Sequence, residues 1–264
     1  MFFISDAHLG SGSDTERRSR LLVELLQGFR FRAGQVYILG DLFDFWFEYR
    51  HAIPKGHFAV LRALADLVDA GIPVDYIGGN HDFWCGTYLN REVGVEVHQR
   101  PIRATHQGRR MFLAHGDGLG PGDMGYRLLK AVLRHPSAIA MYRLIHPDLG
   151  VPLAHRVSTT SRSHTKTRAY YLQRMARFVV GPQFAEGHDA VILGHIHDPM
   201  HLRDRHNRDF LVIGDWLDHF TYVRLREGRF TLERFRPGEA PEHLPPISWP
   251  AGLEPRSGES APAG

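Results

Sequence analysis

Cysteine occurs only once among the 264 residues of this chain, at position 85. A single thiol cannot form a disulfide within the chain, so a disulfide-stapled secreted scaffold is excluded and a reducing compartment is expected. Because Cys85 directly follows Trp84, we interpret it as a small apolar residue rather than a reactive thiol. Lysine is nearly as rare, with copies only at positions 55, 130 and 166, so arginine carries most of the positive charge.

Long apolar runs are also missing. No stretch approaches the roughly 18 apolar residues that are needed to cross a bilayer. The opening MFFIS runs straight into DAHLG, without the basic start or the cleavage site of a signal peptide. We therefore expect a cytoplasmic protein that touches a membrane only at its surface.

A strong charge imbalance is absent as well. The 32 basic residues are offset by 29 acidic ones, which leaves a formal net charge of +3. Despite a pI near 9.1, this balance gives little ground for a polyanionic partner, and no nucleic acid partner is expected. Apolar residues make up 43% of the chain, enough for a sizeable core, and the unusual residue is histidine, with 18 copies.

Short β-like runs alternate with amphipathic helical patterns in the first half of the chain, which predicts a layered α/β (α+β) fold. The spacing of apolar residues predicts helices at 15–28 and 57–70, and Phe58 lies on the apolar face of the second. The predicted strands are 2–5, 35–40, 73–78, 109–114 and 190–194, and the runs within 209–235 are predicted to close the fold as an antiparallel meander.

Residues 1–236 are predicted to form one domain with a long insertion. The insertion spans 123–182 and contains apolar helical patterns such as KAVL and AIAMYRLI, so we expect a helical cap rather than a solvated loop. From Pro237 onward the chain is rich in Pro, Gly, Ser and Glu, which predicts a disordered tail at 237–264.

Each predicted strand of the α/β part ends in a short polar cluster. Because strand ends that share one edge of an open α/β sheet face a common crevice, side chains spread over the whole chain can meet there. The clusters are Asp6-Ala7-His8, Asp41, Asn80-His81-Asp82, His115-Gly116-Asp117 and His195-Ile196-His197.

The residue types in these clusters favour a metal site. Imidazoles mixed with carboxylates and an amide oxygen, without thiolates, suit Mn²⁺, Zn²⁺ or Fe. The candidate ligands exceed the number that one ion needs, and Asp41 would bridge two ions about 3.5 to 4 Å apart, a geometry suited to phosphoryl transfer. The seven candidate metal ligands are Asp6, His8, Asp41, Asn80, His115, His195 and His197.

Each cluster by itself has a simpler interpretation. A single Asp after a strand is more often a helix N-cap, and a lone His-x-His is more often a solvated turn. Five such clusters at successive strand ends favour the metal site.

The stretch GGNHDFW at 78–84 has a specific role in this hypothesis. Gly78 and Gly79 would adopt positive φ and bring the backbone close to the ions, which presents Asn80 as a ligand. His81 would then face the substrate and donate a proton or hydrogen bond to a phosphate oxygen. Asp82 would hold the His81 imidazole in one tautomer from behind.

The ordered set DxH, GD, GNHD, HGD and GHxH between residues 6 and 197 resembles the calcineurin-like metallophosphoesterase superfamily. The resemblance implies a two-layer β sandwich flanked by helices, and two divalent metal ions, for which we expect Mn²⁺. It implies that one ion is held by Asp6, His8, Asp41 and His197, and the other by Asp41, Asn80, His115 and His195.

Within that superfamily the chain resembles the UDP-2,3-diacylglucosamine pyrophosphohydrolase family through GDLFDFWFEY at 40–49, HGDGLGPGDMGYR at 115–127 and RVSTTSRSHTK at 156–166. The resemblance implies hydrolysis of UDP-2,3-diacylglucosamine to UMP and 2,3-diacylglucosamine 1-phosphate in lipid A biosynthesis, with His81, Asn80 and Arg156 in the chemistry. The residues implied to contact the substrate are Asp123, Tyr126, Arg156 and Lys166. Several members have Arg where this chain has His81.

The composition of the insertion is also compatible with a lipid-linked UDP-sugar as substrate. Its Leu, Val, Ile, Met and Tyr residues alternate with Arg and Lys, as in a helical cap that rests on an anionic bilayer, which predicts a peripheral protein on the inner face of the inner membrane. The same residues would equally serve to pack the insertion onto the domain. Two other functions remain open: a phosphoesterase for another phosphodiester or nucleotide, and a noncatalytic binding module without metals.

Overall fold

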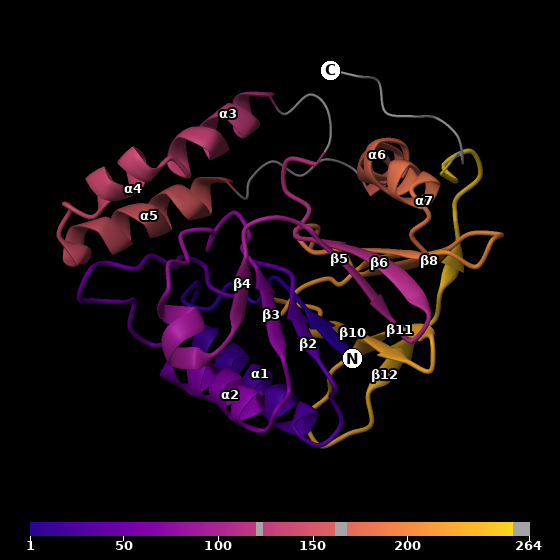
Figure 1. Cartoon of the computed structure of the whole chain (residues 1–264), viewed down its shortest axis with the longest axis horizontal. Coiled ribbons are helices and arrows are strands. Elements are labelled where there is room, and N and C mark those ends of the chain that lie inside the picture. Colours follow the sequence, from indigo (N-terminus) through magenta and orange to yellow (C-terminus); the bar gives the residue numbers. More distant parts are fainter. Residues whose placement is uncertain (120–123, 162–167, 256–264) are drawn as a thin grey trace.

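Two β-sheets form the centre of the molecule in the computed structural model, which describes residues 1–119, 124–161 and 168–255 (Figure 1). In this described part, one sheet has seven strands in the order β12-β11-β10-β1-β2-β3-β4, and the other has six in the order β13-β8-β9-β7-β6-β5. The first contains β1 (Phe2–Ile4), β2 (Val36–Ile38), β3 (Val74–Ile77), β4 (Glu96–His98), β10 (Thr221–Arg226), β11 (Arg229–Arg234) and β12 (Glu242–Leu244). The second contains β5 (Ile102–His106), β6 (Arg109–Ala114), β7 (Ala190–Leu193), β8 (Met200–Arg203), β9 (Asp209–Val212) and β13 (Ile247–Ser248).

The two sheets pack against each other through a fully apolar layer. Phe3 and Tyr37 from the first sheet pack with Leu113, Ile192 and Leu211 from the second. Strands β1 and β7 are buried along their whole length because helices cover their outer faces, which explains why their sequences are apolar throughout instead of alternating. The predicted two-layer α/β sandwich is confirmed.

Helices α1 (Thr15–Phe29) and α2 (Phe58–Asp69) cover the outer face of the seven-stranded sheet, and a π-helical turn, η1 (Leu89–Val93), lies beside α2. Leu22 of α1 and Leu64 of α2 are both fully buried there. One detail of the sequence prediction is wrong. Phe58 is 75% exposed, because α2 turns the stripe that contains Val60 and Leu64 toward the sheet.

Helix α6 (Arg168–Met175), the π-helical turn η2 (Ala176–Val180) and helix α7 (Gly181–Ala185) cover the six-stranded sheet. Met175 and Val179 are buried against residues of β7 and β9. The last part of the segment predicted as an insertion therefore belongs to the helical layer of the sandwich.

The remaining helices of the insertion form a separate group beside the sheets: α3 (Met124–Leu133), α4 (Pro136–Tyr142) and α5 (Pro147–Ser161) (Figure 1). We call this group the cap. Tyr142 of α4 attaches it to the domain, with its ring 4.6 Å from that of Phe47 and 5.0 Å from that of Trp84. Of the described residues, none lies in a helix that is long and apolar enough to cross a membrane.

Three features of the fold differ from the sequence prediction. Strands β4, β5 and β8 were not predicted, because β4 and β8 are only three and four residues long and β5 is half-exposed. The runs at 209–235 do not form one meander, since β9 pairs with β7 and β8 while β10 and β11 form a hairpin in the other sheet. The segment predicted as a disordered tail is ordered in part, because β12 and β13 add one strand to each sheet. Trp249 also stacks on Phe210, with ring centroids 5.6 Å apart, and the burial of this side chain holds the segment on the domain despite its polar composition.

Candidate metal centre

The predicted ligands follow the ends of five strands that come from both sheets. Strands β1, β2 and β3 run parallel in one sheet, and β6 and β7 run parallel in the other. Their carboxyl ends meet at one edge of the sandwich, where the loops after them carry the polar clusters. The structure thus brings together side chains from residue 6 to residue 197, as the strand-end pattern predicts.

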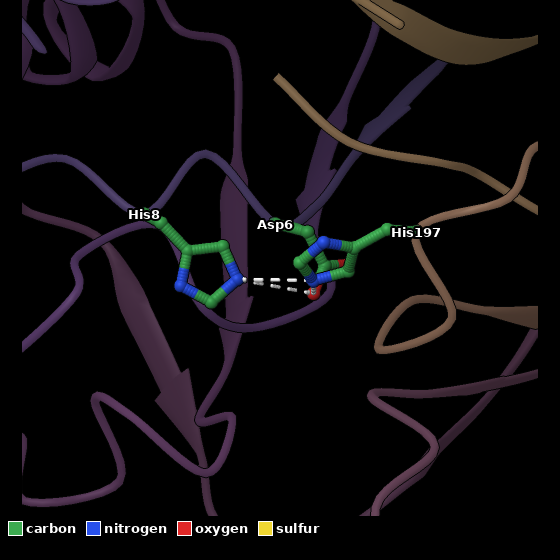
Figure 2. A group of neighbouring side chains, drawn as sticks. All are labelled: Asp6, His8 and His197. Atoms are coloured by element: carbon green, nitrogen blue, oxygen red, sulfur yellow. Dashed lines mark hydrogen bonds and ion pairs between the residues drawn. The ribbon is translucent and has the colours of Figure 1, made fainter. Parts of the chain in front are cut away.

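Three of these side chains point toward one another at the end of β1 (Figure 2). The Nε2 atoms of His8 and His197 lie 3.2 Å apart. The Asp6 Oδ1 atom lies 3.8 Å from Nε2 of His8 and 3.5 Å from Nε2 of His197. Three donor atoms therefore surround one point from three directions.

A second group lies beside the first and contains Asp41, His115 and His195. Asn80 belongs to it, because its Oδ1 lies 3.0 Å from Nε2 of His115. The rings of His115 and His195 meet edge to face at 5.1 Å.

Asp41 lies between the two groups. Its Oδ2 is 3.3 Å from Nε2 of His115 and 3.8 Å from Nε2 of His8. One carboxylate oxygen therefore reaches both groups, which is the position that a carboxylate shared by two ions would take.

The outer ring nitrogens also have partners of the kind that metal-binding histidines use. His115 Nδ1 donates to the Leu39 carbonyl at 2.8 Å, since that oxygen can only accept. His8 Nδ1 lies 3.6 Å from an Asp44 carboxylate oxygen, and His197 Nδ1 lies 3.6 Å from one of Asp215. The hydrogen bond of His115 holds its imidazole so that Nε2 and its lone pair face the centre, whereas the carboxylates near His8 and His197 lie beyond hydrogen-bond distance and act through their charge.

The charges favour a cation. Burial raises the pKa of the Asp41 carboxyl, but the neighbouring imidazoles, first that of His115, outweigh it and hold this pKa well below its usual range. Burial lowers the pKa of His8, so its ring is neutral and has a free lone pair. Asp6 Oδ1 is buried without a hydrogen-bond partner among the described residues. Burial lowers the pKa of His115 and of His197, but Asp41 and Asp6 respectively outweigh it and raise both pKa values, so a positive charge is favoured between the buried carboxylates. Divalent ions would supply that charge, and the chain has His and Asp clusters able to hold them.

The backbone at this site is strained. Asp6, His8, Asp41 and His195 all have φ between 44° and 64°, in the left-handed region that residues other than glycine rarely adopt. Such conformations cost about 1 to 3 kcal/mol each and cluster at functional sites. Four of the seven predicted ligands have this geometry, which aims their side chains away from the strand direction and into the centre.

The glycines of the 78–84 stretch act differently from the prediction. Neither Gly78 nor Gly79 has a positive φ. A Cβ atom on Gly79 would lie 2.1 Å from Asp41 Oδ1, so this position needs glycine because the backbone and the carboxylate are in close contact.

Asp82 does not have the predicted role behind His81. Its carboxylate accepts hydrogen bonds from the backbone N–H groups of Asp41, Phe43 and Gly79 and from the Tyr76 hydroxyl. Asp82 therefore holds the loops of two ligands together. The partner of His81 is Asp44, whose carbonyl oxygen is 3.1 Å and whose carboxylate is 3.8 Å from His81 Nδ1.

Sequence reasoning missed Asp44 and Asp215. Both carry a signal that could have identified them, because Asp44 is the second acid of GDLFD and Asp215 follows β9 in GDW, which is another strand-end cluster. The predicted substrate contacts cannot be compared in the same way: Asp123 and Lys166 lie outside the described residues, as do the side chains of Tyr126 on α3 and Arg156 on α5.

Residues 1–199 match the calcineurin-like phosphoesterase family. The chain belongs to this family and is therefore a hydrolase of the phosphoesterase class. Its relatives include the UDP-2,3-diacylglucosamine hydrolase of Porphyromonas gingivalis, which is 33% identical over 244 residues, 84% of this chain and 92% of the relative. The UDP-2,3-diacylglucosamine hydrolase of Nitrosococcus oceani is 32% identical over 245 residues, 87% of this chain and 97% of the relative. Among solved structures, a dimetal phosphatase from Danio rerio aligns with a TM-score of 0.45 and 14% identity over 88% of this chain and 94% of that one.

Proposed function

We propose that this chain hydrolyses the pyrophosphate bond of UDP-2,3-diacylglucosamine to UMP and 2,3-diacylglucosamine 1-phosphate, a step of lipid A biosynthesis. The observation that carries the proposal is the shared position of Asp41, whose Oδ2 reaches His8 on one side and His115 on the other. The substrate is inferred from the relatives of Porphyromonas gingivalis and Nitrosococcus oceani. Both are named UDP-2,3-diacylglucosamine hydrolase, and this chain is similar to them over most of their length.

The proposed cofactors are two divalent ions, and Mn²⁺ is proposed because it suits the oxygen ligands of Asp6, Asp41 and Asn80, whereas the imidazoles would equally suit Zn²⁺ or Fe. Asp6, His8 and His197 would hold one ion, Asn80, His115 and His195 the other, and Asp41 both. When bound, the ions would neutralise phosphoryl oxygens and lower the pKa of the attacking water.

His81 is proposed to donate a hydrogen bond to the reacting phosphate. Its Nδ1 hydrogen is directed at the Asp44 carbonyl, which can only accept, so Nε2 faces the centre, 3.9 Å from Asp41 Oδ2. With the Nδ1 hydrogen held by that carbonyl, a hydrogen bond from Nε2 to the phosphate requires a second hydrogen on the ring.

In the reaction, water attacks the phosphorus next to the uridine, and the bond from this phosphorus to the bridging oxygen breaks. The lipid 1-phosphate leaves with that oxygen, and the phosphoryl group stays on UMP. Asn80, His81 and Arg156 are proposed to stabilise the charge that builds up on the phosphoryl oxygens. Asp123, Tyr126 and Lys166 are proposed as further contacts to the substrate.

The cap is proposed to meet the lipid and to rest on the inner face of the inner membrane. It exposes an unusual number of large apolar side chains, which is typical of surfaces that contact a lipid or another apolar partner. These side chains are Leu128, Leu129, Val132, Met141, Leu144, Leu149 and Leu153.

Release of UMP tests the reaction. The purified protein with Mn²⁺ should release UMP from UDP-2,3-diacylglucosamine much faster than it cleaves bis-p-nitrophenyl phosphate or cyclic nucleotides. The variants H81A and R156A should lower turnover while the metal content stays near two ions per chain. Equal rates on the simple phosphodiesters, without UMP release, would instead assign another phosphoesterase substrate.

Vesicle flotation tests the membrane contact separately. The double variant L144D/L149D should lose binding to vesicles that contain anionic phospholipid. The matched control is F58D, which places the same charge at an exposed apolar residue on α2 and should bind as the unchanged protein does. Equal binding of all three proteins would exclude the cap as the membrane contact.

A further inference from the structure

The last turn of α3 and Arg134, the residue after it, touch two of the loops that carry proposed ligands of the second ion. Arg134 donates from Nη2 to the Gly79 carbonyl at 3.2 Å. Lys130 Nζ lies 2.5 Å from Asp117 Oδ2. Trp84 donates from its indole nitrogen to the Leu133 carbonyl at 2.8 Å.

These contacts share one side of the helix, because residues three and four positions apart are neighbours on a helix surface. The guanidinium of Arg134 also lies over the Phe83 ring, 4.8 Å from its centroid. Leu133 is the last residue of α3, so its carbonyl receives no N–H from a following helical turn. The Trp84 indole supplies the missing donor. The turn is therefore held to the 78–84 loop by a guanidinium, a ring and an indole together.

Both loops lead to the same proposed subsite. Gly79 directly precedes Asn80, and Asp117 lies two residues after His115. The Asn80 Oδ1 and His115 Nε2 atoms are 3.0 Å apart. A shift of α3 would therefore move Asn80 and His115, two proposed ligands of the second ion, relative to each other. Asp6 and His8, which are proposed to hold the first ion, follow β1 and are not on these two loops.

Small movements of the 78–84 loop would disturb the proposed ligand Asp41. Gly79 packs against Asp41 so closely that a methyl group would overlap the carboxylate. The Lys130–Asp117 pair is also well placed to resist such movement, because the Asp117 side chain is only 5% exposed and that of Lys130 is 24% exposed. An ion pair screened from water is worth more than one on the surface.

We propose that Lys130 and Arg134 are positioning residues that couple the docking of the cap to the second metal subsite. When α3 is docked, Asn80 and His115 keep the positions in which both can bind the second ion. When α3 is released, this subsite binds the ion more weakly. The coupling is reciprocal, so an ion bound there also stabilises the docked cap. This inference rests on the proposed function for the identity of the ligands.

Titration of the metal-free protein with Mn²⁺ tests the coupling. Calorimetry measures the heat of binding, and electron paramagnetic resonance measures the concentration of free Mn²⁺. R134A and K130A should weaken one of the two sites about 10-fold, the size of effect typical for residues that support metal ligands, and leave the other within about twofold. The conservative variants R134K and K130R should recover part of the loss. The matched control is R143A, because Arg143 also attaches the cap through a backbone carbonyl, that of Glu48, which lies outside the 78–84 and 115–117 loops.

Hydrogen exchange in the metal-free protein gives a second measurement. Amides of 78–84 and 115–117 should exchange faster in R134A than in R143A. The proposal is overturned if R134A and R143A alter metal affinity equally, or if neither alters it. A protein that shows the expected metal affinities but releases no UMP would refute the proposed substrate and leave the coupling intact.

Discussion

The Nε2 atoms of His8 and His197 face each other at 3.2 Å although the two residues are 189 positions apart in the chain. Two neutral rings at this distance share one hydrogen at most, and Asp6 Oδ1 lies within 3.8 Å of both nitrogens. A divalent ion would satisfy all three atoms at once. This arrangement leads to the first prediction.

Replacing His197 by Ala should lower the metal content from about two ions per chain to about one, because it removes a proposed ligand of one ion and leaves Asp41, Asn80 and His115 in place. Metal analysis of the purified protein measures this. The matched control is H219A, since His219 also contacts Asp215, at 3.3 Å, without being a proposed ligand. Two ions per chain in H197A would remove His197 from the proposed ligand set.

Removing the metals should destabilise the protein. In their absence the buried carboxylates of Asp6 and Asp41 repel each other, and a ligand present at 100 times its Kd adds about 2.7 kcal/mol to the free energy of unfolding. For a domain of this size that corresponds to roughly 5 to 10 °C in Tm. Thermal unfolding with EDTA and after addition of Mn²⁺ checks the value, and a Tm that does not respond to either addition would contradict a buried metal site.

Replacing Gly79 by Ala should damage the site without unfolding the protein. The new methyl group would lie 2.1 Å from Asp41 Oδ1, and such overpacking costs about 1 to 3 kcal/mol. We expect weaker Mn²⁺ binding and slower UMP release. Gly34 is the matched control, because a Cβ there meets no atom within 4 Å, and G34A should behave as the unchanged protein. Equal Mn²⁺ affinity in G79A and G34A would show that the close contact with Asp41 is not needed.

Replacing Trp249 by Ala should destabilise the fold although this residue lies in a segment of polar composition. Trp249 is 8% exposed and stacks on Phe210, and truncation of such an aromatic side chain costs about 3 to 5 kcal/mol. Urea unfolding measures the loss. F58A serves as the comparison, since Phe58 is exposed and its loss should change stability by less than about 0.5 kcal/mol. If W249A unfolds at the same urea concentration as F58A, the C-terminal strands contribute nothing to stability.

The α/β sandwich could be predicted because strands buried on both faces and amphipathic helices leave a local pattern in the sequence. Short or half-exposed strands such as β4 leave no such pattern. The exposure of Phe58 also escaped prediction, because two overlapping apolar stripes run along α2 and only the packing on the sheet selects one of them. The strands after Pro237 were hidden by composition, since pairing at a sheet edge depends on backbone hydrogen bonds that any residue except proline can make.

The sequence by itself determined which side chains could meet at the candidate metal centre, because each polar cluster directly follows a buried strand and the order of strands and clusters is local information. Only the tertiary structure decided how they meet. The positive φ angles of Asp6 and Asp41, the choice of Asp44 instead of Asp82 behind His81, and the contact of α3 with the ligand loops depend on distances between segments far apart in the chain. Those distances result from the packing of two sheets against each other, which no stretch of sequence specifies alone.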